Sequence, residues 1–252
     1  MGVKVVTMIS DWGRGDLGIG IMRGRFLAQC PDCHLIDLTH DVELQSSSQT
    51  AFVLEHVYDN FPQGTVHLTL TEVSCWSMQP PVITEVDGHF FIGVENGVLA
   101  EIFDDRQLAF RRYSGTGNGT LEMMVNLAVA CLDGSWQSVT ESTEVERVRT
   151  FHATYNSRSS HISGHIVYVD QHNNIVTNIP VEMFREAMEA HSGFECSLST
   201  FHIRRFHEHF MQDNQPYFVP NSLGVMEIVT YGGRVRLLAR WQQELNIEID
   251  FK

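Results

Sequence analysis

The fold is decided by one stretch near the N-terminus, Val5-Val6-Thr7-Met8-Ile9-Ser10-Asp11-Trp12-Gly13-Arg14-Gly15-Asp16-Leu17-Gly18. It opens with a run of β-branched and apolar residues, which predicts a buried strand. A glycine-containing turn follows, and apolar residues at helical spacing from Leu17 to Ala28 predict a helix. The turn holds two carboxylates, Asp11 and Asp16. Because open α/β sheets bind ligands at the carboxyl ends of their strands, this turn is a candidate binding site.

Two carboxylates at such a turn suit a ligand with hydroxyl or ammonium groups, and they would repel a bare phosphate. No G-x-G-x-x-G motif or P-loop is present, so a nucleotide phosphate is not indicated. A purely structural interpretation stays open as well. In that interpretation Asp16 caps the helix and Asp11 completes the turn.

Composition limits the classes of protein to consider. The chain has 252 residues, of which 43% are hydrophobic and 19% charged, enough for one large domain or two smaller ones. Its formal net charge of −14 argues against a nucleic-acid partner, because phosphate binding needs a positive surface. We see no apolar run of membrane-spanning length and no signal segment, so we expect a cytoplasmic protein without a membrane partner.

The five cysteines are an odd number in a chain without a secretion signal, which indicates reduced thiols. Cys30 and Cys33 have C-x-x-C spacing, but no second pair completes a zinc site. We therefore expect neither a metal nor a cofactor.

The order of the predicted elements indicates two domains. In residues 1–140 strands alternate with helices, which predicts an α/β domain: a mostly parallel sheet with helices on both faces. Residues 141–160 are rich in polar residues and are expected to form a linker. Residues 161–252 predict an antiparallel β domain or barrel, with strands at 164–169, 174–179, 201–205, 225–231, 234–238 and 245–249 and one helix at 181–190.

Several motifs are similar to those of one known family. In the first domain these are Asp11-Trp12-Gly13-x-x-Asp16, Gly20-x-Met22-Arg23-Gly24, Ile36-Asp37-Leu38-Thr39-His40, Phe61-Pro62-x-Gly64-Thr65-Val66-His67 and Glu95-Asn96-Gly97-Val98-Leu99. In the second they are Gly164 to Ile179, which contains Asp170-x-His172-Asn173-Asn174, and Asn221-Ser222-x-Gly224-x-x-Glu227-Ile228. Together, and in this order, they resemble the S-adenosylmethionine hydroxide adenosyltransferases, adenosine-forming hydrolases whose family also includes fluorinating and chlorinating enzymes.

The resemblance implies a homotrimer that binds S-adenosylmethionine between neighbouring subunits. Carried over by position, Asp11 would accept hydrogen bonds from the ribose hydroxyls. Asp16 and Asp170 would hold the ammonium group of the methionine part, which pairs two carboxylates with one cation.

The resemblance also assigns the remaining contacts. Ser222 would contact the methionine carboxylate, Asn174 and the backbone of Gly232 would bind adenine, and Phe206 would stack on its ring. Structural alternatives stay open here too: Asp170 and Asn174 build a turn, Ser222 caps one, and Phe206 belongs to the core.

The sequence departs from the family at its catalytic residues. The family reaction displaces methionine from the ribose C5′ carbon by water, with an aspartate, an arginine and a histidine in V-D-P-G-V-G-T-x-R and T-F-H-G-R-D motifs. Here Glu72 stands at the aspartate position, Gln79 lies near the arginine position and Asn118 replaces the histidine. Asn118 can hydrogen-bond a water but cannot take its proton, so Glu72 is the candidate base. Halogenation is disfavoured because Glu72 would repel a halide.

Losing two members of a cooperating set costs several orders of magnitude in rate. We therefore expect slow or altered hydrolysis of S-adenosylmethionine to adenosine and methionine. The alternative is a non-catalytic protein that binds S-adenosylmethionine or a nucleoside. A third hypothesis is a different nucleophile or substrate, with Cys75 and Trp76 reshaping the pocket.

Overall fold

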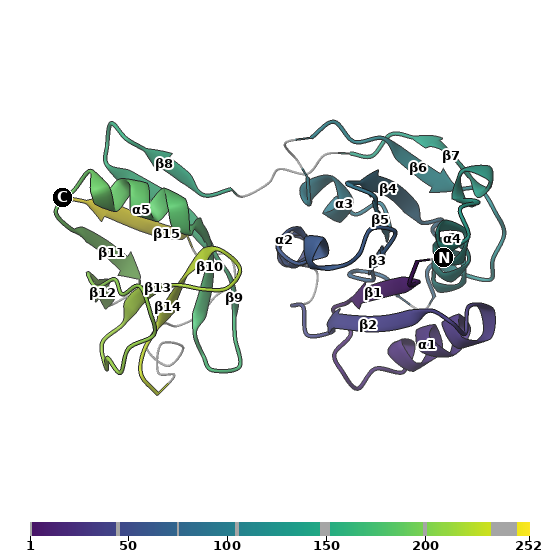
Figure 1. The fold of residues 1–252 in the computed structure, drawn as a ribbon, viewed down its shortest axis with the longest axis horizontal. Coiled ribbons are helices and arrows are strands. Elements are labelled where there is room, and N and C mark those ends of the chain that lie inside the picture. The colour runs from purple at the N-terminus through teal and green to yellow at the C-terminus, as the bar shows by residue number, and fades with distance from the viewer. Residues whose placement is uncertain are drawn as a thin grey trace. The chain divides into compact units, whose positions relative to one another are not determined.

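The computed structural model describes residues 2–43, 46–74, 76–103, 106–146, 152–198, 201–232 and 246–252. The chain divides into two compact units, Met1–Thr150 and Phe151–Lys252 (Figure 1). The first is an α/β unit and the second is built on an antiparallel sheet, which confirms the predicted fold class.

A seven-stranded mixed sheet forms the centre of the first unit (Figure 1). Its strand order is β2 (His34–Thr39), β1 (Val5–Ile9), β3 (Val66–Thr69), β5 (His89–Gly93), β4 (Val82–Val86), β6 (Phe110–Tyr113) and β7 (Thr140–Thr143). The first four strands in this order are parallel and the rest pair antiparallel. The change of direction comes from the β4–β5 hairpin, where Asp87 and Gly88 adopt φ values of 53° and 79°. An Asp-Gly pair with positive φ is the preferred two-residue hairpin turn.

Helices cover both faces of this sheet, as the sequence predicts. On one face α1 (Leu17–Gln29) and α4 (Thr120–Leu132) pack their buried side chains on β1 and β3, with Met22 and Phe26 against Met8 and Leu68. On the other face lie α2 (Ser47–Glu55) and α3 (Val98–Glu101). The carboxyl ends of the parallel strands β1, β2 and β3 therefore meet at one edge of the sheet, where β1 and β3 are fully buried and β2 is partly exposed.

The second unit is an eight-stranded antiparallel sheet that approaches a barrel in shape. Its order is β12 (Phe201–Ile203), β11 (Phe194–Leu198), β15 (Asn246–Phe251), β9 (His161–Val169), β10 (Ile175–Pro180), β14 (Val225–Val229) and β13 (Tyr217–Pro220), with β8 (Thr154–Asn156) paired to β9. Helix α5 (Val181–Glu189) packs Phe184 into a cluster of aromatic rings that includes Phe194, Phe218 and Phe251.

Five strands, β6, β7, β8, β11 and β13, are not predicted from the sequence. Two of them, β7 and β8, fall within residues 141–160 or at their edge, the range expected to be a linker. These strands are short, and several carry charged or polar residues, such as Phe110-Arg111-Arg112-Tyr113, so their alternation is weak. The strand expected at 234–238 lies outside the described residues.

Among the helices that are described, none has the length and apolar character to cross a bilayer.

Candidate functional site

Asp16 stands at the start of α1 and caps it. Its Oδ1 accepts a hydrogen bond of 2.6 Å from the backbone N–H of Gly18, and its own backbone is extended. Asp16 is therefore the N-cap of α1, as the structural interpretation of the sequence predicts. The residue is still exposed, and a capping carboxylate keeps its negative charge. Capping and binding of a cation are compatible.

Asp11 lies beside Glu72, because β1 and β3 are adjacent parallel strands whose register pairs Ile9 with Thr69. The backbone N–H of Glu72 donates to Asp11 Oδ2 at 3.2 Å. The structure therefore brings together the candidate base and the candidate ribose ligand, which are far apart in sequence.

Glu72 has a strained backbone conformation and lies near the negative charge of Asp11. Its φ is 62°, in the left-handed region that side chains rarely adopt. Although much of the residue is exposed, partial burial of its carboxyl group raises the pKa, and the nearby charge of Asp11 raises it further. A carboxyl group with a raised pKa is better matched to accepting a proton near neutral pH.

The segment on both sides of Glu72 is held in place by hydrogen bonds from three other parts of the chain. Trp12 Nε1 donates to the carbonyl of Val73 at 2.8 Å, and Asn96 Nδ2 donates to that of Thr71 at 3.1 Å. Thr120 Oγ1 donates to the carbonyl of Gln79 at 2.7 Å and also bonds Ser77 Oγ at 2.8 Å. The loop nevertheless presents Trp76 to solvent with 87% of its surface exposed. Cys75 lies outside the described residues.

Asn118 lies two residues before Thr120, and the Thr120 bonds bring this turn against the 77–79 segment. Its Nδ2 is 3.4 Å from both carboxylate oxygens of Glu122, at the long limit of a hydrogen bond. Within the described part of the chain Asn118 makes no hydrogen bond to Glu72. The segments that carry Gln79 and Asn118, the expected positions of the family's arginine and histidine, are thus adjacent, and both residues are exposed.

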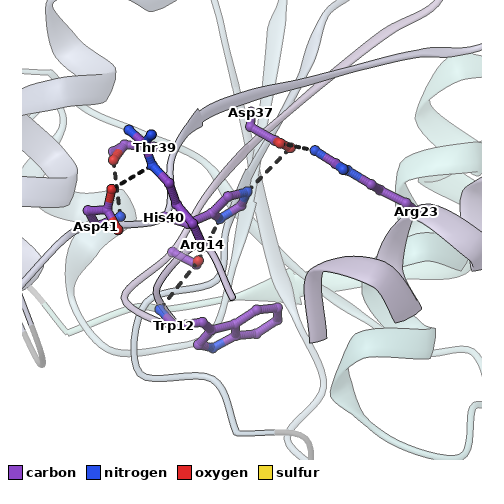
Figure 2. A network of polar contacts seen from close by, with 8 residues as sticks. Trp12, Arg14, Arg23, Asp37, Thr39, His40 and Asp41 are labelled. Atoms are coloured by element: carbon purple, nitrogen blue, oxygen red, sulfur yellow. Dashed lines mark hydrogen bonds and ion pairs between the residues drawn. The ribbon is translucent and has the colours of Figure 1, made fainter. Parts of the chain in front are cut away.

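A network of polar contacts joins Trp12, the residue after Asp11, to the end of β2 and to α1, and it was not singled out from the sequence (Figure 2). Ser10 Oγ and His40 Nδ1 are 2.7 Å apart, and His40 Nε2 is 3.3 Å from Asp37 Oδ1. Asp37 also forms an ion pair with Arg23 of α1. The available signal in the sequence was the Asp37-x-x-His40 spacing within the Ile36-Asp37-Leu38-Thr39-His40 motif.

In the second unit Asp170 organises the turn between β9 and β10. Its Oδ1 accepts from the backbone N–H groups of His172 and Asn174, both at 2.8 Å, and its Oδ2 accepts from Asn174 Nδ2 at 3.0 Å. Asn173 takes the left-handed conformation, with φ at 63°. Asp170 and Asn174 therefore build this turn, as the structural alternative predicts. The structure brings these two predicted site residues together.

Glu227 is a second carboxylate near Asp170, and the sequence analysis gave it no role. It sits on β14 opposite Val176 of β10, and Tyr168 of β9 also pairs with Val176, so the three strands bring these side chains into one row. Burial raises the pKa of Glu227, the charge of Asp170 raises it further, and the amide of Asn221 opposes the shift. A lone glutamate within the apolar strand Val225–Val229 was the available signal.

The other predicted contacts of the second unit have structural surroundings of their own. Ser222 is exposed in a turn that Asn221 builds, since Asn221 Oδ1 accepts from the backbone N–H groups of Leu223 and Val225. Gly232 is exposed with φ at 84°. Phe206 is half-buried against the core, with its ring centre 5.3 Å from that of Phe184. Phe206 therefore packs against the core, as the structural alternative for this residue predicts.

Metal-binding groups and thiols were sought within the described residues. The described residues contain no group of three or more side chains that could hold a metal ion. Burial raises the pKa of Cys30 to about 11 and also raises that of Cys33, so both thiols stay protonated near neutral pH.

Comparisons with solved structures support the fold. The structure is similar to the crystal structure of an uncharacterized conserved protein from Thermotoga maritima, with a TM-score of 0.84 and 18% identity over 97% of this chain and 99% of that one. A conserved hypothetical protein from Thermus thermophilus gives a TM-score of 0.73 with 16% identity over 99% of this chain and 100% of that one.

Comparisons with sequences concern the family. A 105-residue segment is 24% identical to an (R)-S-adenosyl-L-methionine hydrolase from Methanocaldococcus jannaschii, a match that spans 40% of each chain. The model of the SAM hydroxide adenosyltransferase N-terminal domain matches residues 6–156, and the model of the C-terminal domain matches residues 164–249. The two models account for nearly all of the chain, which therefore belongs to the SAM hydroxide adenosyltransferase family.

Proposed function

We propose that this protein binds S-adenosylmethionine and hydrolyses it slowly to adenosine and methionine. The observation that supports the proposal is a pair of carboxylates in each of the two family domains. Asp11 and Glu72 meet at the edge of the first sheet, and Asp170 and Glu227 lie near each other in the second unit. Carboxylates suit the hydroxyl groups and the cationic part of an adenosyl amino acid.

In this proposal the ligand lies between neighbouring subunits of a homotrimer. Asp11 binds the ribose hydroxyls, and Asp16 of the same subunit shares the ammonium group with Asp170 of the next subunit. The methionine carboxylate lies at Ser222. Asn174 and the backbone of Gly232 bind the adenine edge, with Phe206 as the weaker candidate for stacking.

The proposed reaction needs no acid for the leaving group. A water oxygen forms a bond to C5′ while the C5′–S bond breaks, and the sulfonium sulfur takes the electron pair and leaves as the neutral thioether of methionine. The proton of the water passes to Glu72, whose raised pKa favours accepting it. The neutral Gln79 and Asn118 contribute neither a positive charge nor a second base, which makes the reaction slow.

A non-catalytic role is the second candidate, and one observation favours it. Asn118 and Gln79 leave the water without the charged partners that the family's motifs supply, while the predicted binding residues are kept. Such a protein would bind S-adenosylmethionine or adenosine and release it unchanged.

Glu72→Gln separates the two candidates. Incubation of the pure protein with S-adenosylmethionine, with adenosine followed by chromatography, is expected to show steady turnover that Glu72→Gln lowers by at least about a hundredfold, since the amide cannot take a proton. Glu85→Gln, an exposed glutamate of the same unit, is the matched control and keeps the wild-type rate. Tight binding measured by calorimetry without any product would instead establish the non-catalytic role.

Asp16 allows capping and ligand binding to be measured apart. Asn caps helices as well as Asp but carries no charge, so Asp16→Asn is expected to keep the free energy of unfolding while weakening S-adenosylmethionine binding. Asp16→Ala removes the cap as well and costs about 1 kcal/mol of stability. Chemical unfolding and calorimetry on both variants give the two quantities. Equal affinity in Asp16→Asn and wild type would remove Asp16 from the ammonium site.

A further inference from the structure

A relay of polar contacts runs from Arg23 on α1 to the backbone N–H of Trp12, the residue after Asp11 (Figure 2). Arg23 pairs with Asp37, Asp37 contacts His40, and His40 contacts Ser10. Ser10 Oγ in turn accepts from the backbone N–H of Trp12 at 3.4 Å. Ser10 is completely buried and His40 is 4% exposed. Ser10 and Trp12 are the two neighbours of Asp11 in the chain.

The relay has the residue types of a serine-hydrolase triad, but its geometry excludes that chemistry. A nucleophilic serine must reach its substrate, and no part of Ser10 is exposed in this unit. The polar groups must therefore serve the structure around them. Ser10 and His40 are buried and Asp37 Oδ1 is buried beside them, and buried polar groups cost stability unless they are hydrogen-bonded.

The contacts determine which group donates and which accepts at each step of the relay. His40 Nε2 and Asp37 Oδ1 have no hydrogen-bond partner within the described residues, and they lie 3.3 Å apart. A carboxylate oxygen only accepts and Asp37 Oδ1 is the acceptor beside Nε2, so we assign a hydrogen to Nε2 and leave Nδ1 free of one. Nδ1 is then an acceptor, and the hydroxyl of Ser10 donates to it. This leaves the lone pairs of Ser10 Oγ to accept from Trp12.

Backbone hydrogen bonds join the same two strand ends. Gly13 N–H donates to the carbonyl of His40 at 2.7 Å, Ser10 N–H to that of Thr39 at 3.1 Å, and Val42 N–H to that of Ser10 at 3.3 Å. The residues on both sides of Asp11 are thus bound to the end of β2. The Asp11 side chain faces the other neighbour, β3, where Glu72 N–H donates to it.

We propose that His40 is a positioning residue which, through Ser10, holds the Asp11 carboxylate in the orientation that binds the ribose hydroxyls. Asp37 sets the tautomer of His40, and Arg23 holds Asp37 in place. The identity of the ligand rests on the proposed function, whereas the relay does not. Displacement of a binding carboxylate by a fraction of an ångström is enough to weaken its hydrogen bonds, which is why such side chains need supporting contacts.

Two substitutions of His40 test the relay. In His40→Asn the amide stands near the place of Nδ1 and can still bond Ser10, whereas in His40→Leu nothing can. We expect His40→Leu to weaken adenosine binding about tenfold in calorimetry, and His40→Asn to stay within about threefold of wild type. In a Ser10→Ala background the difference between the two His40 variants should vanish, because they act through the same contact. Asp41→Asn, a neighbouring carboxylate that pairs with the exposed Arg14, is the control.

A second readout does not depend on the ligand. Amide hydrogen exchange of Trp12 and Gly13 is expected to accelerate in His40→Leu and to stay at the wild-type rate in His40→Asn and Asp41→Asn. Equal adenosine affinity and equal exchange in His40→Leu and wild type would overturn the proposal. If the wild type binds neither adenosine nor S-adenosylmethionine, the proposed function fails, and the exchange rates alone then decide the role of His40.

Discussion

Replacing Asn118 with histidine and Gln79 with arginine in one chain is expected to raise the rate of adenosine formation by about a hundredfold. The two positions lie on adjacent segments, because Thr120 donates a hydrogen bond to the carbonyl of Gln79 and follows Asn118 by two residues. The histidine would supply a base for the attacking water and the arginine a positive charge beside it. Both positions are exposed, so the substitutions should cost little stability.

The matched control is the double variant Asn118→Gln and Gln79→Met, which changes the same positions without adding a base or a charge. Its rate should stay at the wild-type level. In the faster variant, Glu72→Gln should show whether Glu72 still takes part. An unchanged rate with intact S-adenosylmethionine binding would mean that the attacking water does not lie between these residues.

Acidification from pH 7 to pH 4 is expected to destabilise the first unit through His67. Burial, together with the nearby His89, lowers the pKa of His67 to about 3, against 6.5 in an unfolded chain. Between these values the unfolded state binds more protons than the native state, so stability is lost as the pH falls below 6.5. The loss by pH 4 is on the order of 3 kcal/mol.

Chemical unfolding at pH 7 and pH 4 of wild type and His67→Gln measures this contribution. Glutamine stays neutral and can still hydrogen-bond Thr7, which lies 2.8 Å from His67 Nδ1. The variant should therefore lose clearly less stability on acidification, even if its stability at pH 7 is lower. His34→Gln, an exposed histidine on β2, should behave as wild type. The same pH dependence in His67→Gln and wild type would contradict this account.

Local features of the fold were predictable because their causes are local. The turn at Asp87-Gly88, the cap at Asp16 and the helix after it follow from the conformational preferences of a few adjacent residues. Strand β6 was not predictable in this way, since its two arginines conceal the apolar alternation. It is a strand because β4 and β7 pair with it on either side.

The candidate site was predictable only in part, for the same reason. The motifs indicated Asp11 and Glu72 separately, but their proximity depends on β1 and β3 being neighbours in register, which no spacing in the sequence specifies. The nearness of Glu227 to Asp170 depends in the same way on the order of β9, β10 and β14. His40 and Ser10 are brought together by the pairing of β1 with β2.

The most direct test of the proposed site is a crystal structure of the protein with S-adenosylmethionine or its products bound. The account predicts a trimer in which Asp11 and Asp16 of one subunit and Asp170 of its neighbour all lie within hydrogen-bonding distance of one ligand. Asp11 would contact the ribose, and the other two would contact the ammonium group. A ligand bound elsewhere, or Asp170 turned away from Asp11 and Asp16 in every pair of subunits, would contradict it.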